Sequence, residues 1–195
     1  MKKLSFATAA AVLTAIAAPI AAQQLTTKGY DFIHAVEERN GDKVTQLLAD
    51  NPPGIVNSRN GQGDTGLIVA ISRTDENWTG FLLKNGADVN LGGHNGDTPL
   101  IAAARVGFED AIGWLLDLGA KVDAPNKGGE TPLIVAVQQR QPQIVRILLE
   151  RGANPDKQDS LAGYSARDYA ARDNRGRQIL QLIEAKKPKP PAAGK

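Results

Sequence analysis

The sequence predicts an all-α solenoid of about five helix-turn-helix units, with β-hairpin loops that project between units. Three kinds of short string recur along the chain at one spacing of 33 residues. Strings at one fixed period of about 20–50 residues are typical of stacked repeats. The strings are Asp64-Thr65-Gly66-Leu67, Asp97-Thr98-Pro99-Leu100 and Glu130-Thr131-Pro132-Leu133; Gly86-Ala87-Asp88, Gly119-Ala120-Lys121 and Gly152-Ala153-Asn154; and Leu82-Leu83, Leu115-Leu116 and Leu148-Leu149.

One middle unit explains the pattern in physical terms. The Thr98 hydroxyl is placed to cap a helix, and Pro99 fits the first helical position because its missing N–H has no intrahelical role there. Residues 101–106 are rich in alanine and predict a short inner helix that packs closely. Gly107 ends it with positive φ. Residues 109–118 place their apolar side chains on one face and predict an outer helix.

The remaining part of each unit is a loop, for which 122–130 is the example. It is rich in Gly, Asn and Asp, which is typical of a hairpin. No such unit buries its apolar face alone, so neighbours must stack and share one core. Polar residues in the end units predict caps, so we expect the array to be complete. The predicted units are about 30–57, 58–90, 91–123, 124–156 and 157–185.

Residues 1–22 have the layout of a secretory signal peptide, with a positive start, an apolar stretch and small residues before a polar one. Lys2 and Lys3 form the start, 4–20 carry no charge, and we expect cleavage after Ala22. The alternative is an uncleaved anchor, but the run is short for a spanning helix, which needs about 20 apolar residues. The leader is of bacterial type, so we expect a periplasmic or secreted protein with no stable membrane insertion after cleavage.

Two short segments flank the repeats. Residues 23–29 are expected to be a short N-terminal linker. Residues 186–195 are basic and proline-rich, so they cannot continue a helix and are expected to be extended or disordered. The tail serves for solubility or, alternatively, as a tether to an acidic surface or wall polymer.

Composition excludes several function classes. The chain has no cysteine, which excludes a disulfide framework, a zinc-thiolate site, a cysteine nucleophile and a lipid anchor. Its 23 basic and 21 acidic residues become 21 and 21 when Lys2 and Lys3 are removed. Four of the remaining lysines lie in 186–195, which leaves 17 basic against 21 acidic residues in the body. A mildly acidic body does not seek nucleic acid or an anionic membrane by charge.

The sequence offers no catalytic cluster, which an enzyme would need. His34 is expected to pack or cap in the first inner helix, and His94 lies alone in a hairpin. The adjacent pairs Asp75-Glu76 and Glu37-Glu38 point in different directions on a helix and are solvated surface. Glycine-rich loops lack the lysine of a phosphate-binding loop. We therefore predict no catalytic residue, metal or cofactor, and a protein that is not an enzyme.

The period and the Thr-Pro-Leu and Gly-Ala-Asp strings resemble the ankyrin repeat over about residues 30–185. The family usually has histidine after Thr-Pro-Leu, where Ile68, Ile101 and Ile134 stand here. More apolar packing is expected at these positions. Thr74 and Arg140 replace the glycine between the two helices of a unit, so we expect joints of different shape there.

The resemblance implies that a protein target lies across the hairpin tips and the exposed face of the inner helices. Arginine and tyrosine are enriched among the residues that contribute most of the binding energy in protein interfaces. The strongest candidates are therefore Arg59, Arg73, Arg105 and Tyr164. The full set of implied positions is Arg59, Gln62, Asp64, His94, Asn95, Asp97, Lys127, Glu130 and Tyr164 in the hairpins, and Arg73, Arg105, Gln138 and Gln139 in the inner helices.

The chain resembles small exported, periplasmic ankyrin-repeat proteins of bacteria. We therefore expect a non-catalytic, monomeric binding module that stabilises, inhibits or localises another exported protein. A secreted effector that binds a host protein, a structural spacer and an enzyme are the alternatives. Finding the protein in the medium would favour the secreted effector. Tolerance of every concave-face substitution would favour the spacer, and turnover that is lost on mutation of His94 would favour the enzyme.

Overall fold

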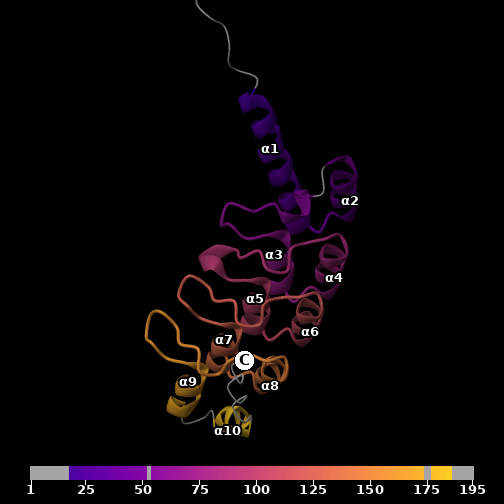
Figure 1. The fold of residues 1–195 in the computed structure, drawn as a ribbon. Helices are drawn as coiled ribbons and strands as arrows, with labels where there is room; N and C mark the ends of the chain where they lie inside the picture. The colour runs from indigo at the N-terminus through magenta and orange to yellow at the C-terminus, as the bar shows by residue number, and fades with distance from the viewer. Residues whose placement is uncertain (1–17, 52–53, 174–176, 186–195) are drawn as a thin grey trace, which may run out of the picture.

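The computed structural model describes residues 18–51, 54–173 and 177–185, which form ten α-helices stacked as five pairs (Figure 1). The inner helices are α1 (Ala18–Glu37), α3 (Gly66–Ser72), α5 (Pro99–Val106), α7 (Pro132–Gln138) and α9 (Ala166–Arg172). The outer helices are α2 (Gly41–Asp50), α4 (Glu76–Lys84), α6 (Glu109–Asp117), α8 (Pro142–Glu150) and α10 (Arg177–Ala185). Each inner helix packs on the next along the stack. The predicted solenoid of helix-turn-helix units is confirmed.

Helix α1 is longer than the sequence suggested. It begins at Ala18, so residues 23–29, expected to be a linker, are helical. No proline or glycine interrupts the chain between Pro19 and Gly29, so nothing there stops a helix. The rest of the predicted leader, 1–17, and the predicted tail, 186–195, lie outside the described residues. No helix in the described ranges is long and apolar enough to cross a membrane.

Repeated threonines start the inner helices. The hydroxyls of Thr65, Thr98 and Thr131 each accept a hydrogen bond from the N–H three residues on, at 3.2–3.3 Å. Ser165 starts α9 in the same way and shares a reciprocal capping box with Asp168. Because each cap fixes where a helix begins, the repeated strings set the register of the stack.

The core runs continuously through the five units, with leucine, isoleucine and alanine facing inward. Ile68, Ile101 and Ile134 are buried, as expected where the family has histidine. His34 was expected to pack or cap, and this prediction is wrong. Its side chain is exposed, with Nδ1 3.2 Å from a carboxylate oxygen of Glu38, because other residues of α1 form the face against the stack.

The joints between inner and outer helices share one backbone shape. Gly107 has φ 78°, Arg39 φ 60°, Thr74 φ 51° and Arg140 φ 56°. The expectation that Thr74 and Arg140 would change the joint is therefore wrong. The antiparallel turn requires the left-handed region whichever residue stands there, and the non-glycine residues adopt it at an energetic cost.

The projecting loops are called fingers below: the first finger is 58–65, the second 91–98, the third 124–131 and the fourth 157–165. The described part of the chain holds no strand in them. Single antiparallel bridges join Arg59 to Thr65 and Gln158 to Ser165. The second finger contains the short 3₁₀ turn η2 (His94–Gly96), and η1 (Ile55–Asn57) precedes the first. Each finger is therefore a narrow loop closed at its base.

Candidate functional site

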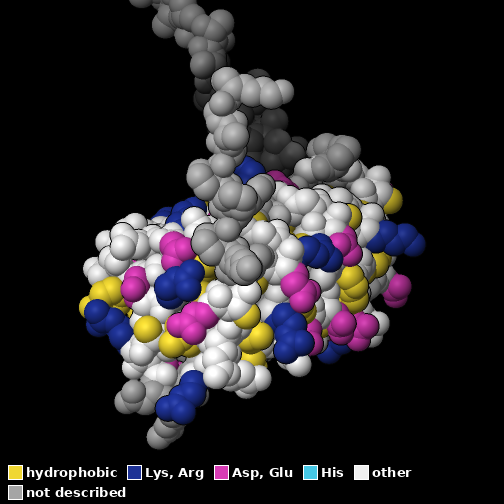
Figure 2. All heavy atoms as spheres, turned by 60° about the horizontal axis from the view of Figure 1, so that its bottom comes forward, with side chains coloured by type: hydrophobic (Ala, Val, Ile, Leu, Met, Phe, Trp, Pro, Cys, Tyr) yellow, Lys and Arg dark blue, Asp and Glu magenta, His cyan; other side chains and the backbone are white. Residues whose placement is uncertain are grey.

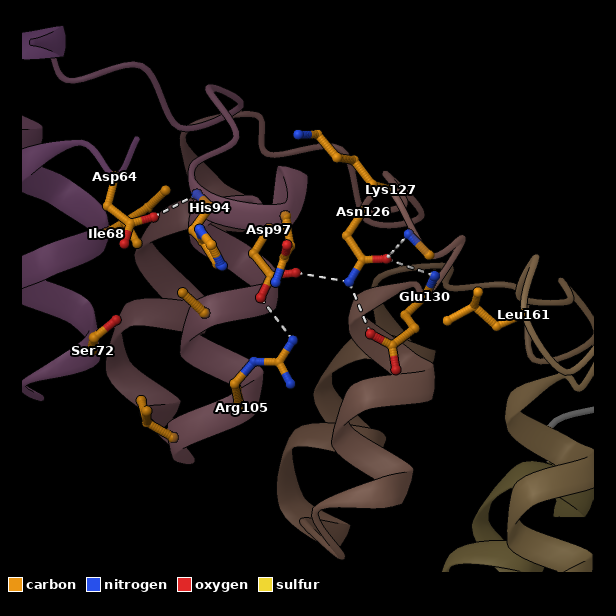
Figure 3. A pocket seen from close by; sticks show the side chains of 14 residues that line it. Asp64, Ile68, Ser72, His94, Asp97, Arg105, Asn126, Lys127, Glu130 and Leu161 are labelled. Carbon is orange, nitrogen blue, oxygen red and sulfur yellow. Dashed lines mark hydrogen bonds and ion pairs between the residues drawn. The ribbon is translucent and has the colours of Figure 1, made fainter. Parts of the chain in front are cut away.

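An open groove of about 660 Å³ lies between the fingers and the exposed face of α3 and α5 (Figure 3). Three consecutive fingers supply most of its lining, and the fourth adds Leu161. The residues that line the groove are Asp64, Ile68, Ser72, His94, Asn95, Asp97, Ala102, Arg105, Val106, Asn126, Lys127, Gly128, Glu130 and Leu161. Charged and aliphatic side chains therefore share one surface.

Most of the residues proposed from the repeat positions come together here. Those that line the groove are Asp64, His94, Asn95, Asp97, Arg105, Lys127 and Glu130. Those that do not are Arg59, Gln62, Arg73, Gln138, Gln139 and Tyr164. The groove also contains Asn126 and Leu161, which the repeat positions did not suggest.

Asp64 and His94 join the first finger to the second. Oδ1 of Asp64 accepts from the backbone N–H of His94 at 2.6 Å, and Nδ1 of His94 lies 3.3 Å from the carbonyl oxygen of Gln62. Gly93 makes room for this contact, because a Cβ there would collide with the Asp64 carboxylate and with Ile68. The first and third fingers have Asn60 and Asn126 at the position of Gly93, and each asparagine side chain holds its own turn. The second finger has no side chain there, so Asp64 of the neighbouring finger holds the turn.

Asn126 organises the third finger and its contact with the second. Its Oδ1 accepts from the backbone N–H of Gly128 and Glu130 at 2.9 and 3.0 Å. Its Nδ2 donates to Asp97 Oδ1 at 2.8 Å and to Glu130 Oε2 at 2.9 Å. All four hydrogen-bonding positions of the amide are thus used. One side chain holds two carboxylates on the same side of the groove (Figure 3).

Arg105 of α5 pairs with one of these carboxylates. Its Nη2 lies 2.7 Å from Asp97 Oδ2, and 42% of the arginine side chain remains exposed against 18% of the aspartate. Ion pairs this exposed contribute about 0.2–1 kcal/mol. The main consequence of the pair is orientation, because it fixes the guanidinium on the groove floor.

Backbone hydrogen bonds also connect the fingers. The N–H of Lys127 donates to the Asn95 carbonyl and the N–H of Ser160 to the Gly128 carbonyl, both at 2.9 Å. Each bond joins neighbouring fingers. With the Asp64–His94 contact, all four fingers form one connected row, so the groove has a preformed wall.

The fourth finger is built around a buried carboxylate. Asp159 Oδ1 accepts from the N–H groups of Leu161, Ala162 and Gly163 at 2.7–3.1 Å, and Oδ2 accepts from the Tyr169 hydroxyl at 2.6 Å. Burial raises the pKa of Asp159, but the hydrogen bonds lower it by more, so the net pKa lies below its usual range.

Tyr169 shows the other side of this pairing. Its hydrogen bond to Asp159, with burial and the nearby negative charge, raises the pKa of its hydroxyl to about 12. The charged aspartate and neutral tyrosine together hold the finger in one shape. This leaves Leu161 at the tip with 85% of its surface exposed.

Most of the proposed residues outside the groove have local partners. Arg59 donates to the carbonyl of Gly63 in its own finger, at 2.6 Å, and Gln62 offers its carbonyl to His94. Arg73 donates to the carbonyl of Glu37 at 2.8 Å, so it ties α3 to the preceding unit.

Tyr164 meets Tyr169 edge-on, and the Arg172 guanidinium lies 3.8 Å from its ring centroid. Gln138 and Gln139 are exposed at the end of α7. These six positions frame the groove or hold neighbouring units rather than line it.

The described residues contain no cluster of three or more His, Asp or Glu side chains that could hold a metal ion. On the face shown in Figure 2, Lys and Arg side chains are interspersed with Asp and Glu, so no large area has one sign.

Comparison with known families decides the relationship. A family model described as ankyrin repeats in three copies matches residues 32–126 and 81–159. The chain belongs to the ankyrin-repeat family. None of the curated proteins compared with it matches. Ankyrin repeats form protein–protein interaction modules and are typically non-catalytic, so this groove is the candidate surface for a protein partner.

Proposed function

We propose that this ankyrin-repeat protein is exported and that it binds another exported protein through the groove, which stabilises, inhibits or localises that partner. The observation that carries the proposal is the groove itself, lined by residues of four connected fingers and two inner helices. Extended concave surfaces of this kind are how stacked repeats engage other proteins. The leader pattern in residues 1–22 supports export.

Export is tested on the full chain in a Gram-negative host. We expect periplasmic protein whose intact mass corresponds to cleavage after Ala22, which leaves residues 23–37 of α1 in the mature chain. A variant with Ala22→Asp should accumulate as precursor, because the cleaving peptidase needs a small residue there. Uncleaved native protein in the cytoplasm would contradict the export proposal. Mature protein in the medium would make a secreted role the better description.

Partner binding is tested by crosslinking the tagged mature protein in its native periplasm, followed by capture and mass spectrometry. The test variant combines Ser72→Trp and Leu161→Trp, two exposed groove residues, so that added bulk blocks the groove without changing its charge. Its matched control combines Gln143→Trp and Leu118→Trp, exposed residues on or beside the outer helices.

We expect one specific partner that the native chain and the control capture and that the groove variant loses. A partner captured equally by all three chains would move the binding surface away from the groove. No specific partner would favour a structural spacer.

A further inference from the structure

We propose that the groove selects a short linear segment that carries a lysine or arginine beside an aliphatic residue. The cation is held by the finger carboxylates and the aliphatic side chain rests on Leu161. This inference rests on the proposed function and names the chemistry of the partner.

The first argument is that the groove is lined by three acidic side chains against two from lysine and arginine. The residues before the three threonine caps are all acidic, namely Asp64, Asp97 and Glu130, and all three line the groove. Arg105 neutralises Asp97. Lys127 extends along the rim in Figure 3 and forms no ion pair with any residue that the structure describes.

The second argument is that these carboxylates are held in place before a partner arrives. Asp64 is fixed through Oδ1 by His94, and Glu130 through Oε2 by Asn126. The second oxygen of each carboxylate can accept from another donor. Asn126 also holds Asp97 close to Glu130, so two negative groups lie near each other, and Arg105 pairs with Asp97. A cation from a partner would complete this arrangement, and charge-assisted hydrogen bonds are strong.

The third argument is an apolar contact at the end of the carboxylate row. Leu161 is 85% exposed and Val106 37% exposed, and both line the groove. The Leu161 backbone is fixed by Asp159, so exposure is not a result of a loose loop. With Ile68 and Ala102, these side chains give the groove apolar surface that an aliphatic side chain of a partner can cover. Acidic and apolar features therefore lie in sequence across the fingers, as a linear segment would meet them.

The probe is a phage-displayed library of random linear peptides, selected on the immobilised mature protein. The strongest peptide is then resynthesised with a fluorescent label, and its binding is measured by anisotropy. The charge variant is Asp64→Asn with Glu130→Gln, which keeps the shape of each side chain and one of its two acceptor oxygens. Its control is Asp50→Asn with Glu150→Gln, exposed acids at the ends of outer helices. Leu161→Ser tests the apolar contact. Circular dichroism confirms that each variant is folded.

We expect selected peptides rich in lysine or arginine with a neighbouring aliphatic residue. The charge variant and Leu161→Ser should each bind at least about tenfold more weakly, and added salt should weaken native binding. The control should bind like the native chain. Selection of acidic or uncharged peptides, or binding that the folded groove variants leave unchanged, would overturn the inference, as would no enrichment. If the native chain still captures a partner that the groove variant loses, the proposed function stands and only this inference fails.

Discussion

At the scale of single residues, the Thr79 hydroxyl is the one buried side-chain polar atom of the described chain that makes no hydrogen bond. Thr79 lies on α4, where α6 has Ile112 and α8 has Val145 at the same repeat position. Its side chain is fully buried. An unsatisfied buried hydroxyl costs about 1–3 kcal/mol. An apolar residue at this position should therefore give a more stable fold than threonine does.

Replacing Thr79 with valine should raise the free energy of unfolding by about 1 kcal/mol, because it removes an unpaired hydroxyl without changing shape. Urea denaturation followed by circular dichroism measures the change. Thr45→Val, at an exposed position of α2, is the matched control and should change stability little. A loss of stability in the Thr79 variant would show that the hydroxyl has a partner after all.

Asp159 makes stability depend on pH. Its folded-state pKa is lowered, so its contribution is present above the ordinary aspartate pKa of about 3.9 and is lost as pH falls through the lower folded value. Asp159→Asn should therefore destabilise the protein at neutral pH and reduce the further loss seen below about pH 4. Urea midpoints at neutral and acid pH provide the measurement, with Asp50→Asn as the exposed control. Equal acid sensitivity of native chain and variant would contradict this role.

At the scale of the structural element, the helix joints show how the same turn is stabilised in different ways. Arg39 and Arg140 adopt positive φ and form ion pairs with Asp75 and Asp173 of the next unit, at 2.9 and 2.7 Å. Among the residues that the structure describes, the Thr74 hydroxyl donates only to the carbonyl of the neighbouring Arg73. A β-branched residue in the left-handed region without a distant partner is the most strained of these joints.

Thr74→Gly should stabilise the protein by about 0.5–1 kcal/mol, since the relieved strain exceeds the added chain entropy of glycine. Arg140→Gly relieves the same strain but loses its pair with Asp173, so we expect a smaller gain or a loss. Thermal denaturation of both variants gives the comparison. A larger gain for Arg140→Gly would mean that the ion pair contributes nothing.

Local signals in the sequence predicted the elements well because each is decided by a few neighbouring residues. Thr98 caps α5 and Gly107 ends it with positive φ, both as expected. The groove was predicted only in part. Asn126 bonds to carboxylates of two different fingers, Asp97 and Glu130. The sequence at position 126 alone does not show such contacts. Leu161 lies in the fourth finger, 157–165, which is one residue longer than the other three, so the 33-residue spacing does not assign its position. Tyr164 is in the expected finger, but its ring packs within the last unit.

At the scale of the whole molecule, stability comes from contacts between neighbouring units, because no unit has a core of its own. Helices α7 and α8 are covered on one side by α9 and α10. Removing the last pair would expose buried side chains of α7 and α8. We therefore expect the last unit to limit self-association of the array.

Deleting residues 157–195 should lower both the free energy of unfolding and the urea m value, the latter by roughly one-fifth, since one of five units no longer unfolds. It should also promote self-association, which light scattering detects. Deleting only 186–195 is the control and should leave stability unchanged. A truncated chain as stable as the native one would show that the last unit is not coupled to the array.

The bonds between fingers have a consequence for hydrogen exchange. The amides of Lys127 and Ser160 belong to exposed residues, yet each donates to a carbonyl of the preceding finger. Such an amide proton exchanges with solvent only when the bond opens, so its rate measures the separation of two fingers without unfolding of any helix. A molecule bound across the row would retard both protons together, even though they lie in different repeats.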